Sequence, residues 1–226
     1  IVTFESDITP LTRILSEYYF NVKAPTLHVS FYDIEVDYDP ELGYSSIDNP
    51  YAPINSVAIY HQFSNRFVVF AVPPKIEDIP EGGVMPKNLQ FFTEEEIMEQ
   101  MSDIAELPID CKLEIHLVQT EKQILLGMMK EFEDSDAILG WNSDFFDFPY
   151  IIERTKILFG ESGIRRWDFP EVKKKPRRRE VEMYGNINVT YDTHGRITAD
   201  YLPLFKKYEM AERPTYKLEA IADEVV

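Results

Sequence analysis

The segment from Leu27 to Val36 constrains the fold most, because it is apolar on both faces of a strand and yet ends in two acids. At the two-residue period of a strand, one face carries Leu27, Val29, Phe31, Asp33 and Glu35, and the other carries Tyr32, Ile34 and Val36. A strand with two apolar faces is typical of the middle of a covered sheet, where an unpaired carboxylate is costly to desolvate. We therefore expect Asp33 and Glu35 to emerge together at the rim of the sheet, where open α/β sheets bind ligands. For this stretch alone, an edge strand whose acids face water is the alternative.

The other elements predict a mixed α/β sheet flanked by helices. Strands are expected at 27–36, 55–61, 66–72, 112–118 and 137–141, and helices at 10–20, 93–105, 121–133 and from about Pro149. The second and third strands are joined tightly through Ser64 and Asn65, which indicates a hairpin. Strands first, followed by alternating strands and helices, favour a single mixed sheet.

Composition excludes several classes of protein. With 44% hydrophobic and 13% aromatic residues among 226, the chain is expected to fold as a globular protein. Cys111 is the one cysteine, so neither a disulfide framework nor a cysteine-based zinc site is expected. No apolar run approaches the roughly 18 to 20 residues of a membrane-spanning helix, so no membrane partner is expected. The P-loop and G-x-S-x-G patterns are missing, which disfavours triphosphate hydrolysis and serine nucleophile chemistry.

A second group of acids lies where the strand expected at 137–141 meets the following helix. The sequence there, GWNSDFFDFPYIIERT, places Asn142, Asp144 and Asp147 in one turn. Taken alone, such residues are ordinary helix caps and turn formers. Together with the two strand acids they supply the hard oxygen ligands that Mg²⁺ or Mn²⁺ prefers, so the two groups predict a metal site.

The charge distribution is uneven. The formal net charge of −17 argues by itself against a nucleic-acid partner, since duplex binding usually needs a basic surface. Residues 173–179, KKKPRRR, nevertheless hold six of the 23 basic side chains. This run is either a solvated loop or a local contact for DNA phosphates. The residues that would make the contact are Lys173, Lys174, Lys175, Arg177 and Arg178.

Two spaced motifs carry a resemblance to a known family. The first is D-x-E, here Asp33 and Glu35, and the second is N-x-x-x-F-D, here Asn142, Phe146 and Asp147, about 110 residues later. The segments FESDITPLTRIL, DYLPLFKKY and PTYKLEAIA extend the similarity over almost the whole chain. Together these features resemble the 3′-5′ proofreading exonuclease domain of the family B DNA polymerases, especially the replicative polymerases of T-even-like tailed phages.

The resemblance implies an RNase H-like fold with an inserted β-hairpin, and removal of nucleotides from a mispaired or single-stranded 3′ end. It also implies Mg²⁺ or Mn²⁺ in a two-metal site, where ions about 4 Å apart activate water and stabilise the attacked phosphate. Asp33 would anchor both metals, Glu35 would hold the ion on the nucleophile side, and Asp147 would bind the other. Asn142 and Phe146 would shape the strand-binding cleft, with Phe146 either stacking on a base or packing in the protein.

The family's third motif, Y-x-x-x-D, has no match after the second, because none of Tyr201, Tyr208 and Tyr216 has an aspartate four residues later. We therefore expect residues 1–26 to be a lead-in from a preceding domain and 27–226 to be an exonuclease domain that stops before its third motif. Such a fragment is expected to bind metal poorly and to hydrolyse DNA slowly or not at all. As partners, the resemblance implies single-stranded and primer-template DNA and the remainder of the polymerase chain, with a sliding clamp as a further candidate. The implied location is the cytoplasm of a phage-infected host cell.

Residues 184–200, YGNINVTYDTHGRITAD, predict a β-hairpin. Ile187, Val189 and Tyr191 alternate up to a turn at 192–195, where glycine suits a positive φ, and a strand then resumes. The resembled polymerases carry a hairpin that helps to separate the primer end from the template. His194 would then lie at the hairpin tip, as a surface residue or DNA contact rather than a metal ligand.

Two alternatives to a polymerase exonuclease remain. A module that binds single-stranded DNA without hydrolysis would keep the basic and aromatic surface, but it would not need Asp33, Glu35 and Asp147 together. An RNase H-like nuclease unrelated to a polymerase would share the acids. It would not explain the lead-in segment, the position of the hairpin or the DYLPLFKKY segment.

Overall fold

The computed structural model describes residues 8–73, 111–172, 174–183, 185–209 and 212–225. The helix expected at 93–105 and the predicted DNA contact Lys173 lie outside the described residues. Across the described part the chain has a mixed α/β fold, which confirms the expected class, an RNase H-like sheet flanked by helices. No helix in that part is long and apolar enough to cross a membrane.

The order of elements follows the sequence prediction closely. The strands are β1 (Val29–Val36), β2 (Ile54–His61), β3 (Arg66–Ala71), β4 (Lys112–Leu117), β5 (Ala137–Gly140), β6 (Arg177–Met183), β7 (Asn186–Asp192) and β8 (Ile197–Asp200). The helices are α1 (Pro10–Tyr19), α3 (Glu121–Glu131), α4 (Asp147–Phe159), α5 (Tyr201–Tyr208) and α6 (Leu218–Val225), with a short 3-10 helix, η2 (Gly163–Trp167). The strands β1 to β5 and the helices α1, α3 and α4 were all expected near these positions.

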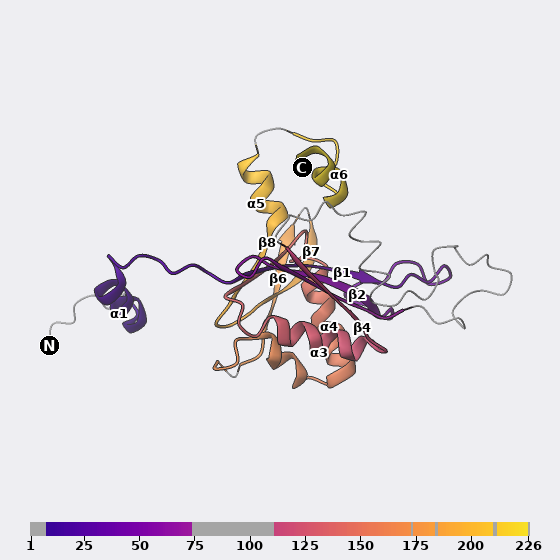
Figure 1. The fold of residues 1–226 in the computed structure, drawn as a ribbon, viewed down its shortest axis with the longest axis horizontal. Coiled ribbons are helices and arrows are strands. Elements are labelled where there is room, and N and C mark those ends of the chain that lie inside the picture. Colours follow the sequence, from indigo (N-terminus) through magenta and orange to yellow (C-terminus); the bar gives the residue numbers. More distant parts are fainter. Residues whose placement is uncertain (1–7, 74–110, 173, 184, 210–211, 226) are drawn as a thin grey trace.

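One sheet runs through the described residues in the order β4-β3-β2-β1-β5-β8 (Figure 1). β1 is antiparallel to β2 and parallel to β5, so it lies inside the sheet, as its two apolar faces predicted. The pairs β3–β4 and β5–β8 are also parallel. The alternative of a solvent-facing edge strand is therefore wrong for β1.

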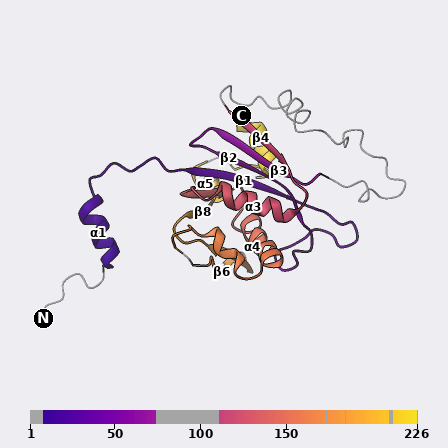
Figure 2. The same ribbon diagram turned by 60° about the horizontal axis from the view of Figure 1, so that its bottom comes forward.

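Helices cover the two faces of this sheet. α3 and α4 lie together against one face, and α5 and α6 lie on the opposite side (Figures 1 and 2). α1 is set apart from the sheet, and all of its residues are exposed. The two faces therefore present different environments: a packed core on the side of α3 and α4, and a more open surface on the other.

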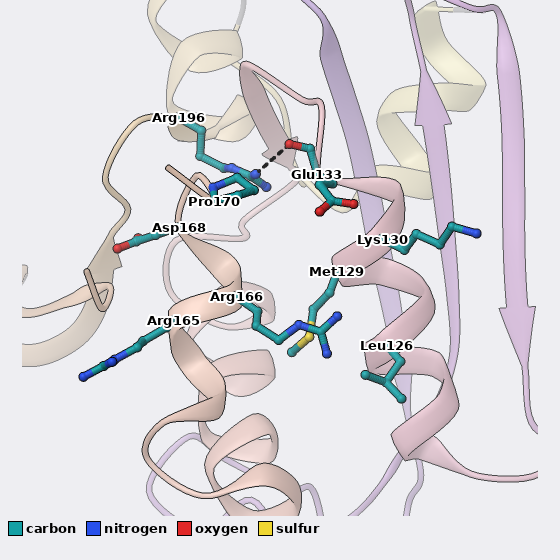
Figure 3. Close-up of a pocket in the computed structure, with 9 residues that line it drawn as sticks. All are labelled: Leu126, Met129, Lys130, Glu133, Arg165, Arg166, Asp168, Pro170 and Arg196. Carbon is teal, nitrogen blue, oxygen red and sulfur yellow. Dashed lines mark hydrogen bonds between the residues drawn. The ribbon is translucent and has the colours of Figure 1, made fainter. Parts of the chain in front are cut away.

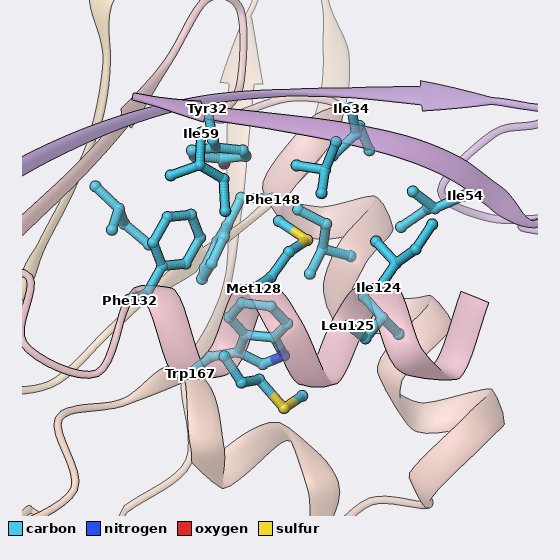
Figure 4. Packing of buried hydrophobic residues seen from close by; sticks show 14 of the residues in the cluster. Tyr32, Ile34, Ile54, Ile59, Ile124, Leu125, Met128, Phe132, Phe148 and Trp167 are labelled. Carbon is cyan, nitrogen blue, oxygen red and sulfur yellow. The ribbon is translucent and has the colours of Figure 1, made fainter. Parts of the chain in front are cut away.

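The core fills the space between the sheet and the pair α3 and α4 (Figure 4). Ile34 enters it from β1, Met128 from α3 and Trp167 from η2, and each is almost fully buried. The buried residues of α3 recur at the spacing of one helix face. Both of its methionines pack in this core.

A buried ion pair joins α3 to α4. The Nε atom of Arg154 donates to Oε1 of Glu121 at 2.7 Å, and a second guanidinium nitrogen donates to Oε2. Glu121 also accepts from the backbone N–H of Ile54 at 3.0 Å, and Arg154 also donates to the carbonyl of Pro50 at 2.8 Å. Through these bonds the pair connects α3 and α4 to the start of β2. Removal of either partner would leave a buried charge uncompensated and would be strongly destabilising.

The predicted hairpin exists, but its position was wrong. β7 pairs antiparallel with β6, from Arg177 opposite Asp192 to Met183 opposite Asn186, so the chain reverses between residues 183 and 186. The segment at 192–195 is not the hairpin turn, because β8 pairs with β5 in the main sheet. Alternating apolar residues predict a strand but do not identify the strand with which it pairs. Here the partner is β6, which begins in the upstream basic run.

Replacing a fully buried isoleucine of α4 should destabilise the protein far more than replacing an exposed one. Ile152 is 0% exposed, whereas Ile157 on the same helix is 58% exposed. We expect Ile152→Ala to lower the free energy of unfolding by about 2–5 kcal/mol, through lost burial and a residual cavity. Ile157→Ala should change it by less than about 0.5 kcal/mol. Urea unfolding monitored by circular dichroism measures both, and equal midpoints would contradict the described packing of α4.

Candidate active site

β1 brings two acids to the less covered face of the sheet. Alternate side chains of this strand are buried in the core, whereas Asp33 is half-buried and Glu35 is exposed. β5 pairs with β1 only from Val29 to Phe31. Within the described residues, the stretch of β1 that carries both acids therefore has no neighbouring strand on the β5 side.

Asp147 lies beside this unpaired stretch. It is the first residue of α4 and is only 6% exposed. The backbone N–H of Ile34 hydrogen-bonds the Asp147 carboxylate. This bond places the helix acid at β1 beside Asp33, whose charge acts on it.

Burial and neighbouring negative charge raise the pKa values of Asp33 and Asp147. Burial, followed by the charge of Asp33, raises the pKa of Asp147 from 3.8 to about 7, although the hydrogen bond from Ile34 opposes this. Burial and then the charge of Glu35 raise the pKa of Asp33. A carboxyl group with a pKa near neutrality retains a proton unless a cation compensates its charge. The arrangement therefore favours the binding of a positive ion.

A tight turn between β5 and α4 positions Asp147. A side chain at Gly140 would place its Cβ 2.6 Å from the Cβ of Ser143 and 3.1 Å from the carbonyl oxygen of Tyr32, so only glycine fits. Asn142 has a φ of 61°, in the left-handed region that asparagine tolerates. The turn thereby brings the first residue of α4 directly against β1.

Asp200, at the end of β8, holds this turn in place. Its carboxylate accepts hydrogen bonds from the backbone N–H groups of Asn142 at 2.8 Å and Leu202 at 2.9 Å. It also accepts a longer bond of 3.4 Å from the N–H of Asp144. Burial and the charge of Asp200 together raise the pKa of Asp144 to about 6.

Sequence analysis missed two polar groups of this site. Asp200 precedes the Tyr-Leu-Pro start of α5, a pattern typical of a helix N-cap, but nothing local to it indicated the turn at Asn142. Tyr32 was assigned only to the core. Its buried phenol bonds the side chain of Ser143, and burial and the charge of Asp147 raise its pKa.

Comparison with known proteins identifies a family. The sequence model described as "DNA polymerase family B, exonuclease domain" matches residues 2–221. The chain belongs to this family. This exonuclease domain is 28% identical over 200 residues to the DNA-directed DNA polymerase of Escherichia phage RB69, covering 87% of the chain and 21% of the phage protein.

Two other relatives match about half of the exonuclease domain. The DNA-directed DNA polymerase of Enterobacteria phage T4 is 35% identical over 104 residues, covering 45% of the chain and 11% of that protein. DNA polymerase 2 of Aeropyrum pernix is 29% identical over 107 residues, covering 46% of the chain and 12% of that protein. The longest of the three matches, to the phage RB69 polymerase, covers 21% of that relative's length.

Family membership confirms the predicted function class, the 3′-5′ exonuclease portion of a family B DNA polymerase, and the resemblance to T-even-like phage polymerases. The matched range includes Asp33, Glu35 and Asp147. The individual roles assigned to these residues stay predictions.

The carboxylates around Asp33 could supply some, but not all, of the ligands of a divalent ion. Among the described residues, no group of three or more His, Cys, Asp or Glu side chains is placed to hold a metal ion. Asp33 is nevertheless the electrostatic neighbour of both Glu35 and Asp147. Mg²⁺ typically takes one or two carboxylates and completes its coordination with water and substrate phosphates. The donor set at Asp33 is of that kind.

Two of the predicted DNA contacts take positions that the sequence did not specify. Phe146 packs on Tyr150, with ring centroids 5.3 Å apart and planes 26° apart, so it is held by the protein itself. His194 is not at the hairpin tip, which corrects the prediction. Its Nδ1 atom lies 3.0 Å from the buried carboxylate of Asp168, and its backbone N–H donates to the same carboxylate at 2.9 Å.

The basic run continues from an exposed loop into β6. Lys174 is exposed, and the ammonium of Lys175 lies 3.5 Å from the carboxylate of Glu161. The exposed arginines of β6 form surface ion pairs. Arg177 lies 2.8 Å from Asp192, and Arg178 lies 2.6 Å from Glu180. Such exposed pairs are weak, so phosphates could replace the carboxylates.

The raised pKa of Asp147 predicts a pH-dependent stability. Because folding raises this pKa from 3.8 to about 7, the contribution of Asp147 to stability is fully present below the lower value and is lost as pH rises through the higher one. Without divalent metal, we expect the native protein to lose stability relative to Asp147→Asn between about pH 4 and pH 7, by up to about 1.4 kcal/mol per pH unit, and to lose no more above that range. Urea unfolding in EDTA across this range measures the difference.

Asp48→Asn is the matched control for this measurement, because Asp48 is an exposed aspartate in the loop before β2. It should show the same pH dependence as the native protein. Parallel stability curves for the native protein and Asp147→Asn would contradict the placement of Asp147 against β1.

Proposed function

We propose that this chain is the proofreading portion of a DNA-directed DNA polymerase and hydrolyses phosphodiester bonds at a single-stranded or mispaired 3′ end. One observation carries the proposal: Asp33 and Asp147, from two distant motifs, lie close enough for the charge of one to raise the pKa of the other. The match to the family supports the reaction class. The proposed partners are single-stranded and primer-template DNA and the remainder of a polymerase chain. A sliding clamp and a location in the host cytoplasm stay predictions.

The proposed chemistry uses divalent ions, as exonuclease domains of this family generally do. When bound, Mg²⁺ or Mn²⁺ would supply an activated water and stabilise charge on the attacked phosphate. Asp33 is proposed to serve both ions, Glu35 the one on the nucleophile side and Asp147 the other. The backbone N–H of Ile34 orients the carboxylate of Asp147, and Asp200 fixes the turn that precedes it.

An aromatic cavity beside Asp33 suits the terminal base of the substrate. It has a volume of about 480 Å³, and its aromatic lining is Phe31, Tyr32, Tyr60, Phe67, Trp141 and Tyr201. The ring of Tyr201 lies edge-on to Phe31 at 6.4 Å and 6.1 Å from Trp141. Aromatic side chains stack on any base, which suits an enzyme that must trim every kind of mispaired end. We place the unpaired 3′ base in this cavity.

Removing the charge of Asp33 should abolish hydrolysis. We expect a form of the chain that includes a Y-x-x-x-D motif, with Mn²⁺ or Mg²⁺, to shorten an end-labelled single-stranded oligonucleotide from its 3′ end. Asp33→Asn should slow this reaction by at least about 100-fold, the loss typical when one charge-stabilising group is removed. Calorimetry with Mn²⁺ provides a second readout that does not require turnover, and the variant should bind the ion at least about tenfold more weakly.

Asp48→Asn removes the same charge from an exposed loop and should leave both readouts unchanged. If the folded form that includes the Y-x-x-x-D motif neither binds Mn²⁺ nor shortens DNA, the nuclease proposal fails. The chain would then be a module that binds single-stranded DNA without cutting it.

Neutralising two arginines of β6 should flatten the salt dependence of DNA binding. Arg177 and Arg178 are exposed and belong to the basic run. Each phosphate contact contributes about 0.7 to the slope of log K against log salt for a single strand, so Arg177→Gln with Arg178→Gln should reduce that slope by about 1.4. Fluorescence anisotropy with a labelled oligonucleotide measures it, with Arg13→Gln on α1 as control. An unchanged slope would make the run a solvated strand.

A further inference from the structure

A second cavity, unrelated to the carboxylate site, lies on the helical side of the protein. It has a volume of about 500 Å³ and is bounded by α3, by η2 and by residues 168–170 that follow η2 (Figure 3). Arg196, just before β8, closes one end of it. α3 and α4 cover the face of the sheet that buries Tyr32 and Ile34, whereas Asp33 points to the other face. This cavity is therefore separate from the proposed nuclease centre.

The cavity concentrates positive charge on a strongly acidic protein. Four cations line it, namely Lys130, Arg165, Arg166 and Arg196, against two acids, Glu133 and Asp168. Both oxygens of Asp168 already accept hydrogen bonds from His194. Among the described residues, none of the four cations forms an ion pair with a carboxylate within 4 Å. On a chain of net charge −17, such a cluster is not a consequence of composition.

Arg196 is the most buried of the four cations, and its hydrogen-bonding groups are only partly satisfied among the described residues. It is only 6% exposed, yet among the described residues its side chain donates a single hydrogen bond, from a terminal nitrogen to the backbone carbonyl of Glu133 at 3.3 Å. Its Nε atom is buried without a partner among the described residues. Burial lowers the pKa of this guanidinium. Asp168 and Glu133 act on this guanidinium electrostatically, and it lies 5.7 Å from the ring centroid of Phe169. Among the described residues neither acid forms a direct ion pair with it, so an anion that entered the cavity would give a buried charge a direct partner.

The rest of the lining is apolar and could contact the base of a nucleotide whose phosphate is bound by the cations. Leu126, Met129 and Pro170 form apolar walls, and the side chain of Arg166 extends toward Met129 (Figure 3). Guanidinium groups bind phosphate through paired hydrogen bonds and also stack on planar rings. A cavity of this volume is within the range that encloses small ligands.

We propose that this cavity binds a nucleoside 5′-phosphate, with the phosphate held by Arg166 and Arg196 and the base against Leu126, Met129 and Pro170. The phosphate belongs either to a free nucleotide or to the 5′ end of a DNA strand. The site does not depend on the proposed nuclease activity, because none of its residues contributes to the carboxylate centre.

Isothermal titration calorimetry with dAMP in EDTA tests the proposal, since chelation removes any metal-dependent binding at the carboxylates. We expect saturable binding by the full chain and about tenfold weaker binding by Arg166→Gln, a loss equal to about 1.4 kcal/mol. Arg166 is exposed at the cavity mouth, so this variant should fold normally. Arg13→Gln removes the same charge on α1, remote from the cavity, and should bind like the native chain.

Competition identifies the source of the phosphate. Deoxyadenosine should not displace dAMP, because it lacks the charged group. Displacement by a 5′-phosphorylated oligonucleotide, but not by the same strand with a 5′-hydroxyl, assigns a strand end; displacement by free nucleotides alone assigns those.

Arg196→Gln supplies a second variant, with circular dichroism to verify its fold. We expect its affinity for dAMP to fall as that of Arg166→Gln does. The proposal is overturned if the native chain shows no saturable binding of dAMP, or if Arg166→Gln and a folded Arg196→Gln both bind it with native affinity.

Discussion

The hydrogen bond from the backbone N–H of Ile34 to the carboxylate of Asp147 is the contact on which the proposed site depends. It exists because β5 stops pairing with β1 at Phe31 and leaves the next part of that strand without a neighbour on one side. A buried backbone N–H needs an acceptor, and a helix that begins at this level supplies one. The same bond that completes the edge of β1 therefore sets the position of an acid beside Asp33.

This arrangement works against stability locally and is retained by packing elsewhere. Glu35 and Asp147 each repel Asp33, and burial raises the pKa values of Asp33 and Asp147. Their partly buried charges would tend to separate if α4 were free to move. The Glu121–Arg154 pair and the core around α4 prevent that movement. Functional sites commonly concentrate such unfavourable terms, and the surrounding fold offsets them.

A second buried polar network shows why geometry without access is insufficient for chemistry. The hydroxyl of Ser30 lies 2.8 Å from Nδ1 of His61, and Nε2 of His61 lies 3.0 Å from the carboxylate of Glu131. A serine, a histidine and an acid linked in this order by hydrogen bonds resemble a catalytic triad. Ser30 is nevertheless fully buried, so no substrate reaches it. The network instead ties β1, β2 and α3 together through satisfied hydrogen bonds.

Local pattern in the sequence determined the strands β1 to β5 and the helices α1, α3 and α4, and it indicated Asp33, Glu35 and Asp147 as candidate site acids. Those features depend on side-chain periodicity and on residue types within a few positions, which a linear sequence displays directly. Local pattern did not show that residues 177–179 belong to a strand or that α5 and α6 are helices. The sequence did not reveal which strands pair. The alternation of β7 did not show that its partner is β6, and the hairpin turn and His194 were misplaced for that reason. Asp200 and Arg196 likewise acquired their surroundings only from the tertiary structure. Strand partners and buried neighbours are chosen by contacts between residues far apart in the chain, and those contacts exist only once the chain has folded.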